Sequence, residues 1–291
     1  MNILKLNNVC KKYGNRNVLF NVSFQVNSGE IVGLVGPNGA GKTTIFKILS
    51  GLINKDSGEV IKSGDVSGII SKTPLYPFLT GKEHLNYIGK INNKYNMKDI
   101  EDFIGIGRKI NDKVSTYSLG MKQRLCLGIL LLNNSEIILL DEPTNGLDNE
   151  GISELRNLLK GLSEERKKTI IISSHNLREI DILCNKIIFV NSGRVVKVID
   201  KTLKNQKKSF VIKFNTNELD KVNELKGKYS LDINDNMVSI TIDEDDVKSI
   251  LELIIMNNIR FKNLEIINLE NYDLESKYNL YINEGKVNGI I

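Results

Sequence analysis

The chain has 291 residues, of which 41% are hydrophobic and 26% charged, as in an ordinary globular protein with one large and one smaller domain. Its net charge of +5 is unevenly distributed. Residues 1–200 have 27 Lys and Arg and 20 Asp and Glu (+7), whereas residues 201–291 have 13 Lys and Arg and 15 Asp and Glu (−2). The chain has no stripe of basic residues interleaved with aromatic ones, the pattern that binds nucleic acid. No apolar run reaches the roughly 18–20 residues of a membrane span, and no signal-peptide pattern begins the chain, so we expect a cytoplasmic protein. The three cysteines are scattered, so we expect neither a disulfide framework nor a zinc site.

The first predicted elements lead to a glycine-rich loop. Strands are predicted at 3–8, 18–26 and 31–35, and a helix is predicted at 45–49 with Leu52 on its apolar side. Between the last strand and the helix lies a complete phosphate-binding motif, formed by Gly36, Pro37, Asn38, Gly39, Ala40, Gly41, Lys42, Thr43 and Thr44. The glycines allow successive backbone N–H groups to point at phosphate oxygens, and the helix N-terminus adds its positive dipole end.

Two side chains of this motif have expected roles in binding a nucleotide. We expect Lys42 to reach the β- and γ-phosphates and the hydroxyl of Thr43 to ligate Mg²⁺. The alternative, a glycine-rich turn without a ligand, does not account for a complete motif flanked by a strand and a helix. The sequence therefore predicts that the chain binds a nucleoside triphosphate.

The middle of the chain alternates between helices and strands. Residues 80–132 have a mostly helical pattern that is interrupted at 105–107. Two buried strands are predicted at 137–140 and 169–173, separated by a helix near 151–162, and this order predicts a parallel sheet with crossover connections. Strands at 187–190 and 194–199, joined by a hairpin turn, complete the domain.

The predicted strand at 137–140 is followed directly by two acids. We expect Asp141 to hold Mg²⁺ through its water shell, and Glu142 to polarise the water that attacks the γ-phosphate. An ordinary turn at the end of a strand is the alternative, since an apolar run followed by two acids is common.

The end of the chain has the pattern of a separate module. Residues 201–208 are polar and basic and are interpreted as a linker, so we predict domains at 1–204 and 205–291. Strands are predicted at 209–214, 229–233, 237–242 and 261–269, and helices at 217–225 and 245–257. This βαββαβ order predicts a small α+β domain of the ferredoxin-like type.

Three further motifs follow the phosphate loop along the chain and lie near the two acids in sequence. Residues 118–124 read Ser-Leu-Gly-Met-Lys-Gln-Arg before an apolar helix, residues 144–148 read Thr-Asn-Gly-Leu-Asp, and residues 171–175 end the next strand with Ser-Ser-His. With these motifs in this order, residues 1–200 resemble the ATP-binding subunit of an ATP-binding-cassette (ABC) transporter. The resemblance implies an α/β P-loop NTPase with a mixed sheet, an antiparallel subdomain and a helical subdomain at about 75–133.

The same resemblance implies a dimer of two cassettes, identical or different, with each ATP between one phosphate loop and the signature segment of the other cassette. On this basis Tyr13 would stack on adenine, although a core or surface tyrosine is the alternative. Ser118 and Gly120 would face the γ-phosphate in the partner. Asp148 would lie at the dimer interface, and His175 would contact the γ-phosphate.

The chain departs from the family pattern at two positions. Leu119 replaces a glycine of the signature segment, and Lys72 occupies the position of a glutamine that contacts Mg²⁺ and the attacking water and couples the site to the permease. A shift of one residue would place Ser71 there instead. Because lysine has only donors, it cannot ligate Mg²⁺, so Lys72 either points away or approaches the γ-phosphate as a charge. The other histidine, His84, is expected to be a solvated helix residue.

Residues 75–85 and 117–125 resemble the exporter branch that serves bacitracin-type and lantibiotic self-protection. The resemblance implies an ATPase that powers a separate transmembrane permease and reaches the inner face of the cell membrane only through it. Three alternatives are a regulatory or weakly hydrolysing cassette because of Lys72, a non-transport cassette ATPase such as an assembly or translation factor, and an unrelated P-loop kinase. The sequence does not specify the transported substrate or the direction of transport.

Overall fold

The computed structural model of the chain describes residues 2–70, 75–89, 97–202, 209–223, 230–234, 236–268 and 274–279. The chain divides into two compact units, Met1–Ile199 and Asp200–Ile291. Ser71, Lys72 and the predicted boundary between residues 204 and 205 lie outside the described residues. Among the described helices, none combines the length and the apolar character that crossing a membrane requires.

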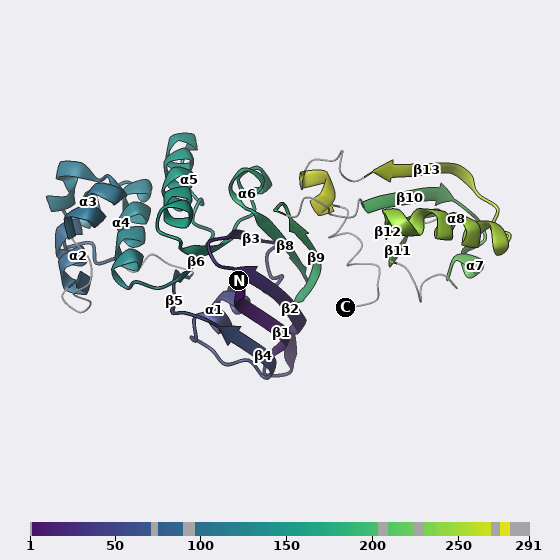
Figure 1. Cartoon of the computed structure of the whole chain (residues 1–291), viewed down its shortest axis with the longest axis horizontal. Helices are drawn as coiled ribbons and strands as arrows, with labels where there is room; N and C mark the ends of the chain where they lie inside the picture. Colours follow the sequence, from purple (N-terminus) through teal and green to yellow (C-terminus); the bar gives the residue numbers. More distant parts are fainter. Residues whose placement is uncertain are drawn as a thin grey trace. The chain divides into compact units, whose positions relative to one another are not determined.

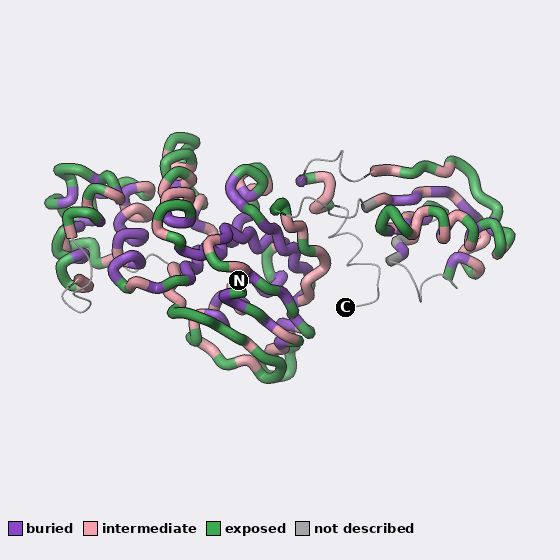
Figure 2. The backbone as a smooth tube through the Cα atoms, viewed as in Figure 1, coloured by how far each residue is buried: buried purple, intermediate pink, exposed green. Residues whose placement is uncertain are grey.

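A six-stranded sheet forms the centre of the first unit, with strand order β5-β6-β7-β3-β8-β9 (Figure 1). From β5 to β8 each neighbouring pair is parallel, which confirms the predicted parallel sheet. The innermost strands are almost continuously apolar and buried, as expected where both faces of a parallel sheet are covered (Figure 2). The strands are β3 (Ile31–Val35), β5 (Val66–Ile69), β6 (Ile137–Asp141), β7 (Thr169–Ser173), β8 (Lys186–Asn191) and β9 (Arg194–Asp200).

Helices cover both faces of this sheet. One face packs against α1 (Lys42–Leu49), whose buried Phe46 belongs to a core shared with the N-terminal strands. On the other face, α5 (Asn149–Glu164) and α6 (Leu177–Leu183) lie together (Figure 1). The prediction for Leu52 is wrong: α1 ends at Leu49, the chain turns at Gly51 (φ +77°), and Leu52 is 66% exposed.

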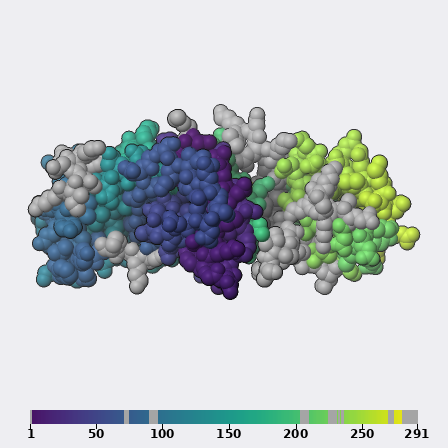
Figure 3. Space-filling model, turned by 90° about the horizontal axis from the view of Figure 1, so that it is seen from below, coloured from purple at the N-terminus to yellow at the C-terminus, as the bar shows by residue number. Residues whose placement is uncertain are grey.

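A second, three-stranded antiparallel sheet has the order β2-β1-β4 and packs over α1. It consists of β1 (Asn2–Tyr13), β2 (Arg16–Asn27) and β4 (Ser57–Lys62). The purple surface in the view from below belongs to the part of the chain that contains β1 and β2 (Figure 3). The sequence pattern did not predict β4 or β5, because β4 is polar and largely exposed and β5 has only four residues.

The predicted helical subdomain, 75–133, contains three α-helices and two short 3-10 helices among its described residues. They are α2 (Gly81–Gly89), α3 (Met97–Ile104), η1 (Gly107–Asn111), η2 (Val114–Thr116) and α4 (Leu119–Leu132). The prediction of a solvated His84 is wrong, since this side chain is 5% exposed. Its Nε2 accepts a hydrogen bond from the N–H of Tyr76 at 2.9 Å, and its Nδ1 lies 2.8 Å from the carbonyl of Thr80. The ring thus satisfies two backbone groups in the segment that leads into α2.

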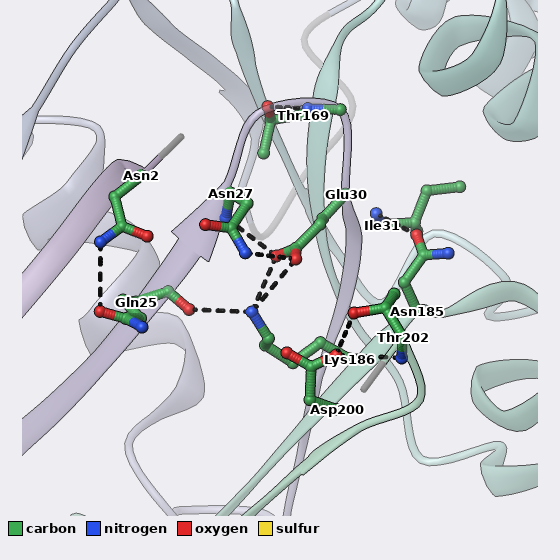
Figure 4. Close-up of polar contacts among 11 residues, drawn as sticks. Asn2, Gln25, Asn27, Glu30, Ile31, Thr169, Asn185, Lys186, Asp200 and Thr202 are labelled. Carbon is green, nitrogen blue, oxygen red and sulfur yellow. Dashed lines mark hydrogen bonds and ion pairs between the residues drawn. The ribbon is translucent and has the colours of Figure 1, made fainter. Parts of the chain in front are cut away.

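A buried ion pair lies where β3 and β8 begin, at the opposite end of β3 from the phosphate loop (Figure 4). Nζ of Lys186 lies 2.9 Å from Oε2 of Glu30, and the two residues are 4% and 8% exposed. The same carboxylate accepts hydrogen bonds from the backbone N–H and the side-chain amide of Asn27, at 2.8 and 2.7 Å. Because buried charges require both a partner and hydrogen bonds, this cluster fixes the end of β2 against the central sheet.

The second unit is built on a four-stranded antiparallel sheet with the order β11-β12-β10-β13. Ile212, Ile240 and Ile250 belong to a hydrophobic core that contains residues of this unit only. In chain order its elements are β10 (Ser209–Asn215), α7 (Leu219–Asn223), β11 (Ser230–Asn234), β12 (Met237–Asp243), η4 (Glu244–Asp246), α8 (Val247–Met256) and β13 (Lys262–Asn268).

Candidate nucleotide-binding site

A pocket of about 660 Å³ opens beside the ends of β3 and β6 in the first unit. Its volume lies in the range of small-molecule and cofactor sites. The lining residues come from β1, β2, the phosphate loop, α1, the end of β6 and the segment that follows it: Tyr13, Arg16, Val18, Asn38, Gly39, Ala40, Gly41, Lys42, Thr43, Thr44, Asp141, Glu142 and Asn145. The structure therefore brings most of the predicted nucleotide-binding residues together.

The loop between β3 and α1 has the backbone conformation that the motif predicts. Gly39 and Gly41 have φ values of +81° and +105°, a region that favours glycine. A Cβ at Gly36 would overlap the carbonyl oxygen of Val190 at the end of β8. The N-terminus of α1 begins directly after Gly41, so its unsatisfied N–H groups are available to an anion in the pocket.

The turn between β8 and β9 supports this loop from behind. The N–H of Gly193 donates to the carbonyl of Ala40 at 3.0 Å, and the carbonyl of Gly193 accepts from the N–H of Phe20 at 2.8 Å. Gly193 has a φ of +76°, and a Cβ there would overlap the carbonyl of Val18, which itself lines the pocket. The turn thus joins the phosphate loop to β2 through backbone hydrogen bonds, and there is no space for a side chain at Gly193.

Lys42 lies inside the loop rather than in solvent. Its Nζ donates to the carbonyls of Gly36 and Pro37 at 2.6 and 3.2 Å, and the residue is 7% exposed. Burial lowers the pKa of Lys42 below its usual value, while the carboxylates of Glu142 and Asp141 act in the opposite direction. The ammonium group is held where the loop N–H groups and the helix N-terminus converge, which suits binding of phosphate oxygens.

A chain of hydrogen bonds next to Lys42 joins the side chains of Thr43, Asp141 and Ser173 and the backbone N–H of Glu142. The hydroxyl of Thr43 donates to Oδ2 of Asp141 at 2.9 Å, and the hydroxyl of Ser173 donates to Oδ1 of Asp141 at 2.6 Å. The N–H of Glu142 in turn donates to the hydroxyl of Ser173 at 2.9 Å. The sequence motifs assign no role to Ser173. The available signal is that this serine ends β7, just as Asp141 ends β6.

The predicted catalytic pair is also together. Oε2 of Glu142 lies 2.8 Å from Nδ1 of His175, and its side chain is 21% exposed against 68% for the histidine. Glu142 has a φ of +51°, an uncommon conformation for a residue with a side chain and one that is often found at functional sites. A carboxylate at the pocket wall with a histidine beside it can accept a proton from a bound water.

Thr43 and Asp141 fit a magnesium ion that is bound jointly with a nucleotide. Mg²⁺ takes few protein ligands, usually hydroxyl or carboxylate oxygens, and completes its shell with water and phosphate oxygens. In the part of the chain that the structure describes, no group of three or more His, Cys, Asp or Glu residues could hold a metal alone. The oxygens of Thr43 and Asp141 are adjacent at the pocket, so they meet this requirement.

The remaining predicted residues lie apart from the lining of the pocket. Ser118 is exposed at the start of α4, and its hydroxyl accepts from the N–H of Met121 at 3.2 Å. Asp148 is exposed at the start of α5, where its Oδ1 accepts from the N–H of Gly151 at 2.8 Å. Gly120 lies in the first turn of α4. In contrast, Tyr13 lines the pocket at its rim and is 46% exposed.

Comparison with known families agrees with this geometry. Residues 19–145 match the family model described as "ABC transporter", and residues 113–181 match a second model described as an AAA domain. An ABC transporter ATP-binding protein of Bacillus subtilis, YhcH, is 33% identical over 280 residues, which covers 91% of this chain and 92% of YhcH.

Two further relatives have names that state a transported compound. The lantibiotic transport ATP-binding protein SrtF of Streptococcus pyogenes is 38% identical over 205 residues, covering 67% of this chain and 89% of SrtF. The bacitracin transport ATP-binding protein BcrA of Bacillus licheniformis is 35% identical over 212 residues, covering 68% of this chain and 69% of BcrA.

Among solved structures, the dimeric ATP-binding cassette MJ0796 bound to ADP and Pi is similar to this chain. It is 28% identical, with a TM-score of 0.60, and the match covers 68% of this chain and 98% of that chain.

Proposed function

Because the chain belongs to the ATP-binding proteins of ABC transporters, we propose that it hydrolyses ATP to power a separate membrane permease that exports an antibiotic peptide, a drug or a lipid-like substrate. The observation that carries this proposal is the convergence of Lys42, Thr43, Asp141 and Glu142 on one pocket. Each of these groups provides one of the functions that phosphoryl transfer requires.

The proposed mechanism assigns a role to each side chain. Lys42 and the loop N–H groups bind the β- and γ-phosphates and hold them at a fixed position. Thr43 and Asp141 would hold Mg²⁺, which would neutralise charge on the phosphates. Glu142 accepts the proton of the attacking water. The proposed role of His175, which is in contact with Glu142, is to contact the γ-phosphate.

We further propose that two cassettes act together. Ser118 and Asp148 are exposed away from the pocket of their own chain, as expected for groups that complete the site of a second cassette. The dimeric state of MJ0796 supports this arrangement. Whether the second cassette is an identical chain is tested by the size of the complex with ATP.

Two relatives support the proposed substrate class. SrtF and BcrA are named for lantibiotic and bacitracin transport, and this chain is 38% and 35% identical to them. We also propose that the chain lies at the cytoplasmic face of the cell membrane, bound through its permease.

For the second unit we propose a ferredoxin-like accessory domain that begins near residue 205. The strand order β11-β12-β10-β13 places the first and third strands of the unit at the centre of the sheet. Its separate core, which includes Phe214 and Ile254, supports folding as a module without a part in the chemistry.

Co-purification tests the transport function most directly. A tagged chain is expressed with its permease, and hydrolysis of ATP by the purified complex is measured with and without bacitracin or a lantibiotic. We expect a membrane protein to co-purify and the peptide to raise the rate, with the Glu142→Gln complex as the inactive control. A complex that hydrolyses ATP slowly at any peptide concentration supports the regulatory alternative. An active chain that binds no membrane protein supports a non-transport ATPase.

A further inference from the structure

Parallel pairing places Ser173 beside Asp141. In the register of β6 and β7, Asp141 is the partner of Ser173, so both side chains leave the same end of the sheet in the same direction. Ser173 is completely buried. A hydroxyl buried at this position requires hydrogen-bond partners, and those partners are the carboxylate of Asp141, which ends β6, and the backbone N–H of Glu142.

The hydroxyl of Ser173 uses both its donor and its acceptor. It donates to Oδ1 of Asp141 at 2.6 Å, while Oδ2 of the same carboxylate accepts from Thr43. It accepts from the N–H of Glu142 at 2.9 Å, and the carbonyl of Ser173 lies 3.2 Å from the same N–H. The orientation of the Asp141 carboxylate is therefore set from two sides, and the backbone of Glu142 is held at its φ of +51°.

We propose that Ser173 is a positioning residue for ATP hydrolysis: its hydroxyl orients the carboxylate of Asp141 toward the magnesium ion and fixes the backbone from which Glu142 reaches the attacking water. This inference rests on the proposed function of Asp141 and Glu142. Groups that orient a metal-binding carboxylate typically contribute 10–100-fold to metal affinity or activity. Ser173 itself does not belong to the residues that line the pocket.

The neighbouring serine has different partners. Ser174 is also completely buried, but its hydroxyl accepts from the N–H of Asn176 at 3.0 Å and lies 3.4 Å from the hydroxyl of Thr144. We therefore expect a loss of metal binding and activity on replacement of Ser173 but not on replacement of the adjacent Ser174. Ser163 provides a distant control, because its buried hydroxyl donates to the carbonyl of Gly29 with the same length of 2.6 Å as the bond from Ser173 to Asp141.

The test separates metal binding from nucleotide binding in the full chain. The dissociation constant of AMP-PNP is measured by calorimetry in EDTA and in excess MgCl₂, and the ratio of the two reports the contribution of the metal. For Ser173→Ala we expect an unchanged constant in EDTA and a ratio reduced by about tenfold, with a similar loss in kcat. Ser173→Thr, which restores the hydroxyl, should recover most of the ratio, and Ser163→Ala should keep the wild-type ratio.

Each other outcome has a defined meaning. If Ser173→Ala lowers the melting temperature as Ser163→Ala does but keeps the wild-type ratio and kcat, the proposal is wrong and Ser173 only stabilises the fold. A ratio reduced equally in both alanine variants also overturns it, because the effect would then follow general destabilisation. If wild type shows no binding of AMP-PNP with Mg²⁺, the proposed function fails instead.

Discussion

The imidazole of His175 and the carboxylate of Glu142 are in direct contact, with Nδ1 and Oε2 2.8 Å apart. The backbone N–H of His175 lies 3.3 Å from the same oxygen, so the histidine contacts Glu142 through both its ring and its main chain. The two residues follow β6 and β7, which are adjacent in the sheet. The proposed base and the proposed γ-phosphate contact are therefore one unit rather than two independent groups.

This contact predicts that changes at the two residues are not additive. Glu142→Gln should lower kcat by about 10²–10⁴ because it removes a positioned base, and His175→Ala should lower it by a smaller factor. The double variant should lose less than the product of the two losses, since the groups act together. Single-turnover hydrolysis of ATP measures all three. If the loss of rate in the double variant equals the product of the losses in the two single variants, the histidine and the glutamate act independently.

Replacement of Lys42 should abolish binding of ATP, because Lys42→Ala removes the cation held inside the phosphate loop. Equilibrium binding of ATP checks this. Lys47→Ala is the matched control, since Lys47 lies in the last turn of the same helix and does not line the pocket. A change in affinity of less than about threefold in Lys42→Ala, about 0.7 kcal/mol, would mean that the phosphate site is assigned wrongly.

The positive φ of Glu142 predicts that the stability of variants at this position depends on whether the new residue has a Cβ. Its φ of +51° is strained for any residue with a Cβ, so Glu142→Gly should be more stable than Glu142→Ala by roughly 1 kcal/mol, although glycine raises the entropy of the unfolded chain. Both variants should be inactive. Denaturant unfolding measures the difference, and equal stability of the two variants would contradict the role of backbone strain.

Lys72→Gln should raise ATP hydrolysis or its coupling to the permease, because an amide offers an oxygen to Mg²⁺ or the attacking water and lysine offers only donors. If Lys72 instead stabilises charge in the transition state, the variant should be slower by about 10²-fold. Hydrolysis by the complex with its permease distinguishes the two. An unchanged rate would mean that Lys72 takes no part.

Deletion of residues 208–291 should leave a cassette that binds ATP. The two units have separate cores, and the pocket is lined by residues of the first unit only. The melting temperature of the shortened chain should rise when ATP is added, and we expect the same of the full chain. An insoluble product without such a rise would show that the two units depend on a common core.

The sequence predicts the site better than the elements around it. Strand, glycine loop and helix are local in sequence, so the position of Lys42 follows from a continuous pattern. The role of Ser173 depends on the parallel register between β6 and β7, which joins residues 32 apart in the chain. Sequence periodicity does not specify which strands become neighbours.

The errors have similar causes. The sequence predicts a solvated His84, but its ring is buried and accepts a hydrogen bond from the backbone N–H of Tyr76, eight residues away. For β4, pairing with β1 outweighs its polar sequence, since the ladder satisfies the backbone whatever its side chains are.

The support of the phosphate loop by the turn at Gly193 has a consequence for synthesis of the protein. The ribosome makes the loop more than a hundred residues before it makes β8 and β9, whose ends contact Gly36 and Ala40. A nascent chain that stops before this turn has the complete motif in its sequence but lacks the backbone that shapes it. Binding of nucleotide should therefore begin late during translation, after the turn has left the ribosome.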